Sequence, residues 1–312
     1  MSIDRFVARA GISQSLLGKR GARVTQVQFA TLYRMLAVEL DDEMAGIFSR
    51  PLRNGFLKYL CLSLLDASTL EVAMHRFGQF FHLILDDVEI ESSVDTGRAR
   101  IAVVKPRGGH EVSVLGMELM LKLAHGVASW LVAQKIPLLQ VEFDFTRPAH
   151  ASDYLYLFPG PVQFNCAQTS MQFDASYFAL PIRQRKSDLR TFLARAPEDW
   201  IFTSFSDQVA SHRVRQYLES KLPEIATVDV VAHALHYSAR TLARRLGAEG
   251  TTFQAVKDEL RRDIAIQRLT TTDDALASIA FDIGFDDPTA FHRAFRHWTG
   301  STPSAYRDVS RN

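Results

Sequence analysis

Cysteine is scarce in this sequence, and the two cysteines stand far apart. Cys61 and Cys166 form no CxxC pair, so we expect neither a disulfide framework nor a structural zinc site. No apolar run approaches the roughly 18–20 residues that a membrane-spanning helix needs, and the first residues lack the apolar block of a secretory signal peptide. These absences predict a protein of the reducing cytoplasm without a membrane segment.

An excess of either charge is also absent. The chain of 312 residues carries 36 Lys+Arg and 35 Asp+Glu, which gives a formal net charge of +1, and residues 208–312 alone are nearly balanced as well. A basic excess is common in nucleic-acid-binding domains, so the composition gives no support to that function class. Any basic surface has to be local, so it can be predicted only from the positions of individual Lys and Arg residues in the sequence.

Signatures of catalysis and of cofactor binding are missing too. The sequence has no nucleophile elbow, no HExxH pair, no GxGxxG loop and no phosphate-binding P-loop. His75 and His82 share one predicted helix face, but no nearby cysteine or carboxylate set completes a metal site, which favours structural histidines. We therefore predict no catalytic residues, no metal and no cofactor.

The length of the chain and the changing period of its apolar residues predict two domains. Residues 1–182 mix helices with antiparallel strands, residues 183–206 have weak periodicity and form the connection, and residues 207–312 are helical. In the first domain we predict helices at 26–40, 52–65, 70–85 and 111–134, a hairpin at 88–104, and strands at 139–145, 162–165 and 171–173. The sequence thus predicts an α+β N-terminal domain followed by an all-α C-terminal domain.

An internal repeat lies in the helical part. Three positions recur 48 residues later with similar residues: Ala232 and Ala280, Leu235 and Ile283, Tyr237 and Phe285. Each copy reads as a short helix with an inward alanine, a tight turn, and a second helix with apolar residues four apart. A small residue in the first helix lets the second cross closely over it, which is the packing of a helix-turn-helix.

The second copy has distinct turn and capping signals. Gly284 stands where a positive φ is needed, Asp287 can cap the next helix, and Pro288 fits its first turn. The inward face of that helix consists of Phe291, Phe295 and Trp298, and the outward face of Thr289, His292, Arg293 and Arg296. Arginine can bond to two guanine atoms at once, so this outward face is a candidate reader of the DNA major groove.

The first copy has the same division into two faces. Ser238 is the expected cap, and Ala239, Leu242 and Leu246 point inward. The outward residues are Arg240, Thr241, Ala243, Arg244 and Arg245, of which Arg240 and Arg244 are one turn apart and are the best candidates for base contact. A charged face on a short helix is more often simply solvated, but the repeat, the turn glycine and the two matched recognition-type helices favour DNA contact.

These residues carry a family resemblance. The segment 279–296, followed by 299–303 and by Tyr306 and Arg307, closely resembles the signature of AraC/XylS-type transcription regulators, and 238–246 and 260–269 resemble other parts of their DNA-binding domain. The resemblance implies two helix-turn-helix units joined by the long helix 253–269, with both recognition helices in successive major-groove faces. By position it assigns base-facing roles to Arg240, Ala243, Arg244, Pro288, Thr289, His292 and Arg293.

The N-terminal domain resembles the arabinose-binding-like regulatory domain of a subset of that family. The resemblance rests on Asp41-Asp42, residues 50–53, 80–82, 85–87 and 161–165. It implies that this domain senses a small effector and mediates dimer formation. Polar residues in apolar settings are the candidate effector contacts, although each has a surface-reaching or satisfied side chain as its alternative: Arg53, Asn54, Lys58, His75 and His82.

Taken together, the residues and the resemblance predict an effector-responsive activator of a catabolic operon. Its expected partners are operator DNA, a small-molecule effector, RNA polymerase and a second copy of the chain. One alternative is a constitutive dimeric DNA-binding regulator without a ligand. Another is a small-molecule enzyme with a DNA-binding tail, which would need a convergent catalytic set in residues 1–180.

Overall fold

A computed structural model describes residues 3–19, 21–106, 108, 110–158, 160–201, 210–224, 226–248 and 251–307. The chain divides into two compact units. The α+β unit contains Tyr33–Phe205, and the helical unit contains Met1–Leu32 together with Ser206–Asn312. The grouping of the first residues with the C-terminal helices has no counterpart in the sequence prediction, and the domain boundaries at residues 182 and 206 stay predictions.

The α+β unit is built on a five-stranded sheet with the strand order β1-β2-β5-β3-β4. Its strands are β1 Glu89–Asp95, β2 Arg98–Val104, β3 Gln140–Glu142, β4 Val162–Gln163 and β5 Thr169–Asp174. The predicted hairpin is present: β1 and β2 pair antiparallel from Glu89 opposite Val104 to Asp95 opposite Arg98. Burial alternates along β2 from Arg98 to Ile101 because the helices cover one face of the sheet, whereas Ile101, Ala102 and Val103 are all buried in its second half.

One strand pair differs from the antiparallel sheet predicted from sequence. β3 and β4 are parallel, with Val141 opposite Val162 and Glu142 opposite Gln163. The chain between them passes through the short helices η2 (Ala151–Asp153) and α6 (Tyr154–Leu157), so it returns to the same edge before β4 begins. A hairpin turn would make the pair antiparallel, whereas a crossover of this kind allows the parallel direction.

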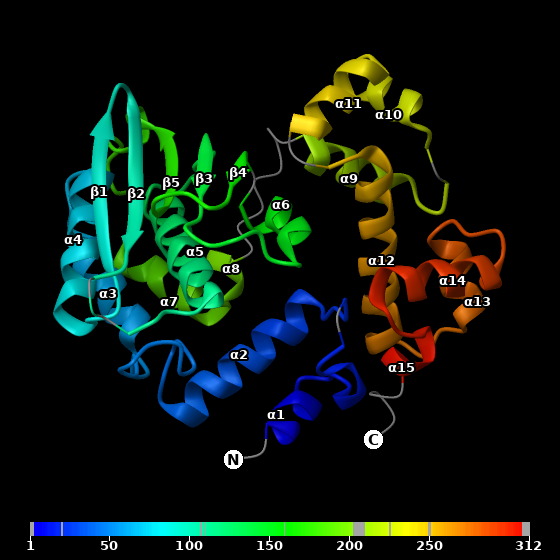
Figure 1. Cartoon of the computed structure of the whole chain (residues 1–312), viewed down its shortest axis with the longest axis horizontal. Helices are drawn as coiled ribbons and strands as arrows, with labels where there is room; N and C mark the ends of the chain where they lie inside the picture. The colour runs from blue at the N-terminus through cyan, green and yellow to red at the C-terminus, as the bar shows by residue number, and fades with distance from the viewer. Residues whose placement is uncertain are drawn as a thin grey trace. The chain divides into compact units, whose positions relative to one another are not determined.

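Helices cover one face of the sheet in two layers. Besides η2, α6 and the second part of α2 (Gln26–Leu40), this unit contains α3 Phe56–Leu64, α4 Leu70–Ile84, α5 Val114–Leu131, α7 Lys186–Arg195 and α8 Glu198–Ile201, with η3 Ala175–Tyr177 after β5. α4 packs on β1, and α5 packs on β2 and β5 beside it (Figure 1). α3, α7 and α8 lie beyond them, since α3 contacts α4 and α7, and α8 contacts α5.

Helix α5 is the central helix of the α+β unit. Its 18 residues are apolar enough to meet the length and composition of a membrane span, which the sequence reading missed, but 83% of them are buried inside the unit. Its polar residues are also held inside. Lys122 donates a hydrogen bond to the carbonyl oxygen of Leu157 at 2.8 Å, and burial lowers the pKa of Lys122 to about 7. The apolar character of α5 is therefore explained by its place in the core.

Part of the segment predicted as a connection is helical and packed. Within residues 183–206, α7 and α8 belong to the α+β unit, and Trp130 of α5 stacks on Phe192 of α7 with ring centroids 4.5 Å apart. Residues 202–206 lie outside the described residues. Between residues 186 and 201 the weak periodicity reflects two short helices, each with two buried residues.

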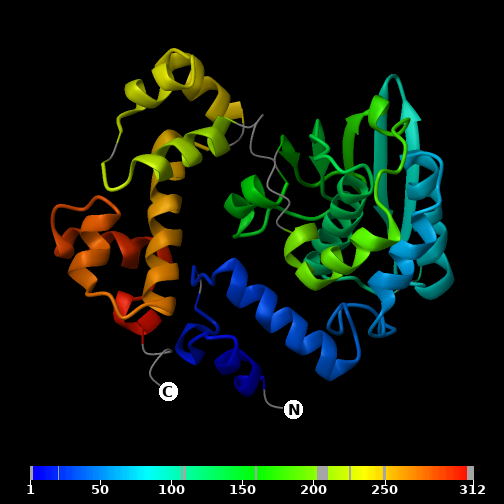
Figure 2. The same ribbon diagram turned by 180° about the vertical axis from the view of Figure 1, so that it is seen from behind.

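In the helical unit, α12 runs along two groups of helices, α9–α11 at one end and α13–α15 at the other (Figure 2). The bounds are α9 Ala210–Lys221, α10 Val228–Ala234, α11 Ala239–Ala248, α12 Phe253–Thr271, α13 Leu276–Asp282, α14 Pro288–Thr299 and α15 Pro303–Arg307. Each group has its own apolar core: Val214, Leu242 and Leu246 belong to the first, and Phe291 and Phe295 to the second. The helices of both predicted helix-turn-helix units are thus present, although the start predicted for α9 at residues 207–209 lies outside the described residues.

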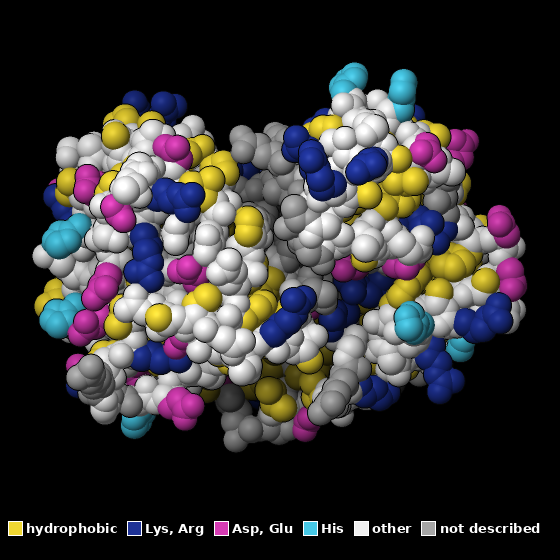
Figure 3. Space-filling view, turned by 45° about the horizontal axis from the view of Figure 1, so that its top comes forward, with side chains coloured by type: hydrophobic (Ala, Val, Ile, Leu, Met, Phe, Trp, Pro, Cys, Tyr) yellow, Lys and Arg dark blue, Asp and Glu magenta, His cyan; other side chains and the backbone are white. Residues whose placement is uncertain are grey.

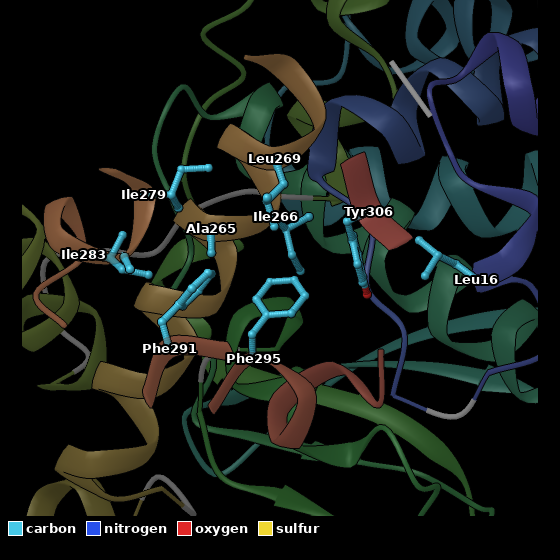
Figure 4. Packing of buried hydrophobic residues seen from close by; sticks show 10 residues of the cluster. Leu16, Ala265, Ile266, Leu269, Ile279, Ile283, Phe291, Phe295 and Tyr306 are labelled. Atoms are coloured by element: carbon cyan, nitrogen blue, oxygen red, sulfur yellow. The ribbon is translucent and has the colours of Figure 1, made fainter. Parts of the chain in front are cut away.

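The N-terminal segment completes the second of these cores. It consists of α1 Asp4–Arg9, η1 Gln14–Leu16 and the start of α2, which spans Gln26–Leu40. Leu16 is 6% exposed and is part of the cluster with Phe295 and Tyr306, as Figure 4 shows. The backbone amide of Arg23 donates a hydrogen bond to the Tyr306 hydroxyl at 2.9 Å. The second group of helices therefore takes part of its core from the beginning of the chain.

Candidate nucleic-acid interface

The beginning of helix α14 is fixed by local hydrogen bonds. The Asp287 carboxylate accepts hydrogen bonds from the backbone amides of Thr289 at 2.9 Å and Ala290 at 3.1 Å. These bonds hold the pKa of Asp287 below its usual value. Pro288 occupies the first turn, where its missing amide costs nothing, and Gly284 has a φ of 79° in the turn before the helix. The turn and cap predicted from sequence are confirmed.

Helix α14 has a buried face and an exposed face. Phe291 and Phe295 are 1% and 0% exposed, and both rings point towards Ala265 and Ile266 of α12 (Figure 4). Trp298 is only partly buried and packs at the edge of the same cluster. On the other side Thr289, Arg293 and Arg296 are exposed, while Pro288 and His292 are partly exposed. The aromatic anchors fix the rotation of the helix, so the arginines are held outward.

Helix α11 has the same arrangement in the first group. The Ser238 hydroxyl caps it by accepting from the Thr241 amide at 3.1 Å, and Leu242 and Leu246 are fully buried. Arg240, Ala243 and Arg244 are exposed, whereas Thr241 is partly buried with its hydroxyl 2.9 Å from that of Ser238. Arg245 lies over the Tyr237 ring, 4.8 Å from its centroid. Arg240 and Arg244 are therefore both exposed, one turn apart on this helix.

The two turns use the same backbone conformation with different residues. Gly284 and His236 occupy equivalent places, 48 positions apart, with φ values of 79° and 62°. Glycine adopts this left-handed region freely, whereas residues with a Cβ atom meet steric strain there. The first turn therefore forms despite a histidine that does not favour its backbone conformation.

We expect Gly284→Ala to lower the free energy of unfolding of the helical unit by about 1–2 kcal/mol, because it adds a Cβ atom in the left-handed region. The matched control is His236→Ala, which keeps a Cβ atom at the same φ and should change stability by less than about 0.5 kcal/mol. Thermal melting of both variants measures the difference. Equal losses in the two variants would contradict this account of the turns.

An arginine from the helix that precedes each helix-turn-helix unit donates hydrogen bonds to the backbone carbonyl oxygens of its turn. Arg261 of α12 donates to the carbonyl oxygens of Ile283 at 3.0 Å and Gly284 at 2.7 Å, and lies 4.5 Å from the centroid of the Phe285 ring. Arg213 of α9 donates to the Leu235 carbonyl at 3.4 Å and lies over the Tyr237 ring. From sequence, Arg261 was noted only within the family resemblance of 260–269 and neither arginine was given a role at a turn, although the two are also 48 positions apart. Extending the repeat backwards by one helix would have found them.

The visible charges are mixed rather than uniformly basic. Figure 3 shows Lys and Arg side chains interspersed with Asp and Glu side chains over the described residues of the face that it presents. This agrees with the near-zero net charge of the chain. No broad positive field is visible on this face, so the local arginines of α11 and α14 are the candidates for attraction to DNA.

A cavity in the α+β unit holds two of the predicted effector contacts. It has a volume of about 370 Å³, within the size range of small-molecule sites, and it is lined mainly by apolar side chains of α2, α3, α5, α7 and α8. Asn54 and Lys58 line it. Arg53 does not, and its guanidinium group is 3.4 Å from the Asp41 carboxylate instead. His75 and His82 are exposed on α4, away from this lining.

The residues that give this cavity its chemistry were not among those predicted from sequence. Glu43, Tyr33, Phe56 and Trp200 all line it. They come from separate segments of the chain, so no local spacing connects them. No group of three or more His, Cys, Asp or Glu residues in the described part of the chain is placed to hold a metal ion.

Comparison with known proteins identifies two domain families in this chain. The model of the N-terminal arabinose-binding domain of AraC transcription regulators matches residues 1–182, and a helix-turn-helix domain model matches residues 231–308. The ornithine utilization regulator of Pseudomonas aeruginosa is 30% identical over 256 residues, which cover 82% of this chain and 75% of that protein. The HTH-type transcriptional regulator VirS of Mycobacterium tuberculosis is 23% identical over 316 residues, covering 97% and 89% of the two chains.

A solved structure, that of the transcriptional regulator CdpR from Pseudomonas aeruginosa, is 19% identical and covers 98% of this chain and 96% of that one, with a TM-score of 0.34. That score is too low to bear on the arrangement of the whole chain. The domain matches and the exposed arginine faces define the class of protein: a DNA-binding transcription regulator with a ligand-binding-like N-terminal domain. The chain belongs to the AraC family.

Proposed function

We propose that this regulator responds to a small-molecule effector and activates transcription of a catabolic operon. It works in the cytoplasm as a homodimer on operator DNA, with RNA polymerase as a further partner. The N-terminal domain match and the cavity in the α+β unit support the effector, and the name of the ornithine utilization relative supports a catabolic target. The dimer rests on the family alone, and sedimentation of the full chain measures it.

The observation that carries the proposal is the repeated pairing of a buried apolar face with an exposed basic face. Leu242 and Leu246 anchor α11, and Phe291 and Phe295 anchor α14. Because anchored helices keep a fixed rotation, their outer side chains can meet base edges in register. The proposed DNA-contacting residues are Arg240, Thr241, Ala243, Arg244, Pro288, Thr289, His292, Arg293 and Arg296.

We expect Arg244→Ala and Arg293→Ala each to weaken specific operator binding by about 1–3 kcal/mol, because each loses donors to a base edge. Both side chains are exposed, so melting of the protein should hardly change. An operator can be selected from a pool of random DNA with the unmodified protein. Titration of labelled operator then gives the affinities, with random-sequence DNA as the competitor.

Arg76→Ala is the matched control, since it removes the same charge from the α+β unit, where Arg76 pairs with Asp66 at 2.5 Å. It should leave operator affinity unchanged. Normal operator binding by Arg244→Ala or Arg293→Ala would refute the base-contact role of that arginine. A loss that is equal for operator and random DNA would instead identify a phosphate contact.

A further inference from the structure

Glu43 places a carboxylate in the wall of the cavity in the α+β unit. The loop that carries it is held by Asp42, whose carboxylate accepts from the backbone amides of Leu52 at 2.9 Å and Gly46 at 2.7 Å. One Glu43 carboxylate oxygen accepts from the amide of Gly55 at 2.6 Å and the other from that of Leu57 at 2.8 Å. The carboxylate is therefore fixed in position at the start of α3.

Each oxygen of a carboxylate can accept more than one hydrogen bond, so these two amides leave acceptor capacity on Glu43. Among the described residues, no lysine or arginine forms an ion pair with it. Burial raises the pKa of Glu43, because the loss of water around its charge outweighs the two amide hydrogen bonds that stabilise it. A cation entering the cavity would supply the missing partner.

The two basic residues of the lining are differently placed. Arg34 pairs with Glu198, and its Nε donates to the Ala196 carbonyl at 2.8 Å, so its charge is already used. Lys58 is exposed, with its ammonium group 5.5 Å from the centroid of the Tyr59 ring. Neither side chain neutralises the carboxylate in the wall.

Aromatic rings form much of the remaining wall. Tyr33 and Trp200 meet edge to face with ring centroids 6.1 Å apart, and Phe56 lies at the start of α3. The hydroxyl of Tyr33 donates to the Glu43 carbonyl oxygen, which orders this ring against the loop. Aromatic faces attract organic cations, and a carboxylate beside them adds a charge-assisted hydrogen bond.

We propose that this cavity binds a small organic amine, with its ammonium group on Glu43 and its carbon skeleton against the aromatic wall. The proposal rests on the effector-responsive function proposed above and names the class of effector. A carboxylate or a neutral alcohol of the same length would lack the charge that Glu43 requires. Lys58 is exposed and takes no part in holding the amine.

Binding is tested on the full chain with probes that differ in their head group. The amines are n-hexylamine, 1,5-diaminopentane and choline, and the matched probes are n-hexanol and hexanoate, each titrated by calorimetry. We expect at least one amine to bind and Glu43→Gln to weaken it roughly ten- to a hundred-fold, the loss expected for a hydrogen bond to a charged group. Amine affinity should also fall with decreasing pH as the Glu43 carboxylate takes up a proton, while hexanol shows no such change.

Asp41→Asn is the matched control: it removes the same charge two positions away, where Asp41 pairs with Arg53 outside the cavity lining. It should leave amine binding intact, and so should Lys58→Ala. If Glu43→Gln does not fold, Leu193→Trp fills part of the cavity, leaves the carboxylate in place and should abolish binding.

Failure of all three amines to bind would overturn the proposal. So would amine binding that a folded Glu43→Gln leaves unchanged. If that variant does not fold, amine binding that survives Leu193→Trp would overturn the proposal, as would hexanoate binding that is tighter than hexylamine binding and depends on Lys58. Titration of operator DNA with and without bound amine distinguishes failure of the amine site from failure of the proposed effector response. An amine that binds through Glu43 but alters neither operator affinity nor transcription would refute effector control and leave the site. An effector that acts independently of Glu43 would refute the site and leave effector control.

Discussion

Replacing Phe295 by alanine is expected to lower the free energy of unfolding of the helical unit by about 3–5 kcal/mol. The ring is completely buried, and its centroid lies 5.6 Å from that of Phe291 and 5.2 Å from that of Tyr306. Its removal leaves a cavity between α12, α14 and α15 that neighbouring helices cannot fully close. Operator binding should be lost with it, because α14 loses the anchor that fixes its rotation.

Trp298 reports on this loss, since its ring lies 5.8 Å from that of Phe285 at the edge of the same core. Urea titration of the full chain, with Trp130 and Trp200 replaced by phenylalanine, follows its fluorescence alone. Phe281→Ala is the matched control, because Phe281 is 49% exposed on α13. Its effect should stay within about 0.5 kcal/mol. Comparable losses from both variants would show that the assigned inside face is wrong.

Leu16→Ala is expected to destabilise the same helical unit by about 2–5 kcal/mol, although Leu16 is far from it in sequence. The side chain is 6% exposed and fills the core beside Tyr306. The same Trp298 titration measures the effect, and operator affinity should fall with it.

Its neighbour gives the control: Leu17 is 46% exposed, so Leu17→Ala should be nearly neutral. Tyr306→Phe offers an independent check, because it removes the hydroxyl that accepts from the Arg23 amide and should cost about 1 kcal/mol. If Leu16→Ala and Leu17→Ala melt alike, the N-terminal segment does not contribute to this core.

The second helix-turn-helix unit, α13 and α14, could be predicted from sequence because the residues that determine its structure are close together in the chain. Gly284, Asp287 and the spacing of Phe291 and Phe295 each act within one or two turns, and the structure has every one of these features where the sequence indicated them. The first pair was predicted with equal success apart from its turn, where a histidine adopts the conformation of a glycine.

The cavity could be predicted only in part because its wall is assembled from distant segments. Asn54 and Lys58 were identified as polar residues in apolar surroundings and do line it, but Arg53 met the same criterion and pairs with Asp41. Glu43 stands in a run of acidic residues that is equally typical of a solvated loop. The packing of five helices decides which of these side chains faces the cavity, and no short sequence pattern predicts that packing.

The contribution of Leu16 to the core around Tyr306 also sets an order of events during protein synthesis. At about 5–20 residues per second, a ribosome needs about 15–60 s to travel from the codon of one residue to that of the other. Throughout that interval the early apolar side chain has no core to enter. A nascent chain that terminates before α15 can therefore carry a finished α+β unit, but it cannot close the core that holds α14. Only a chain translated through α15 gains a fully folded DNA-binding unit.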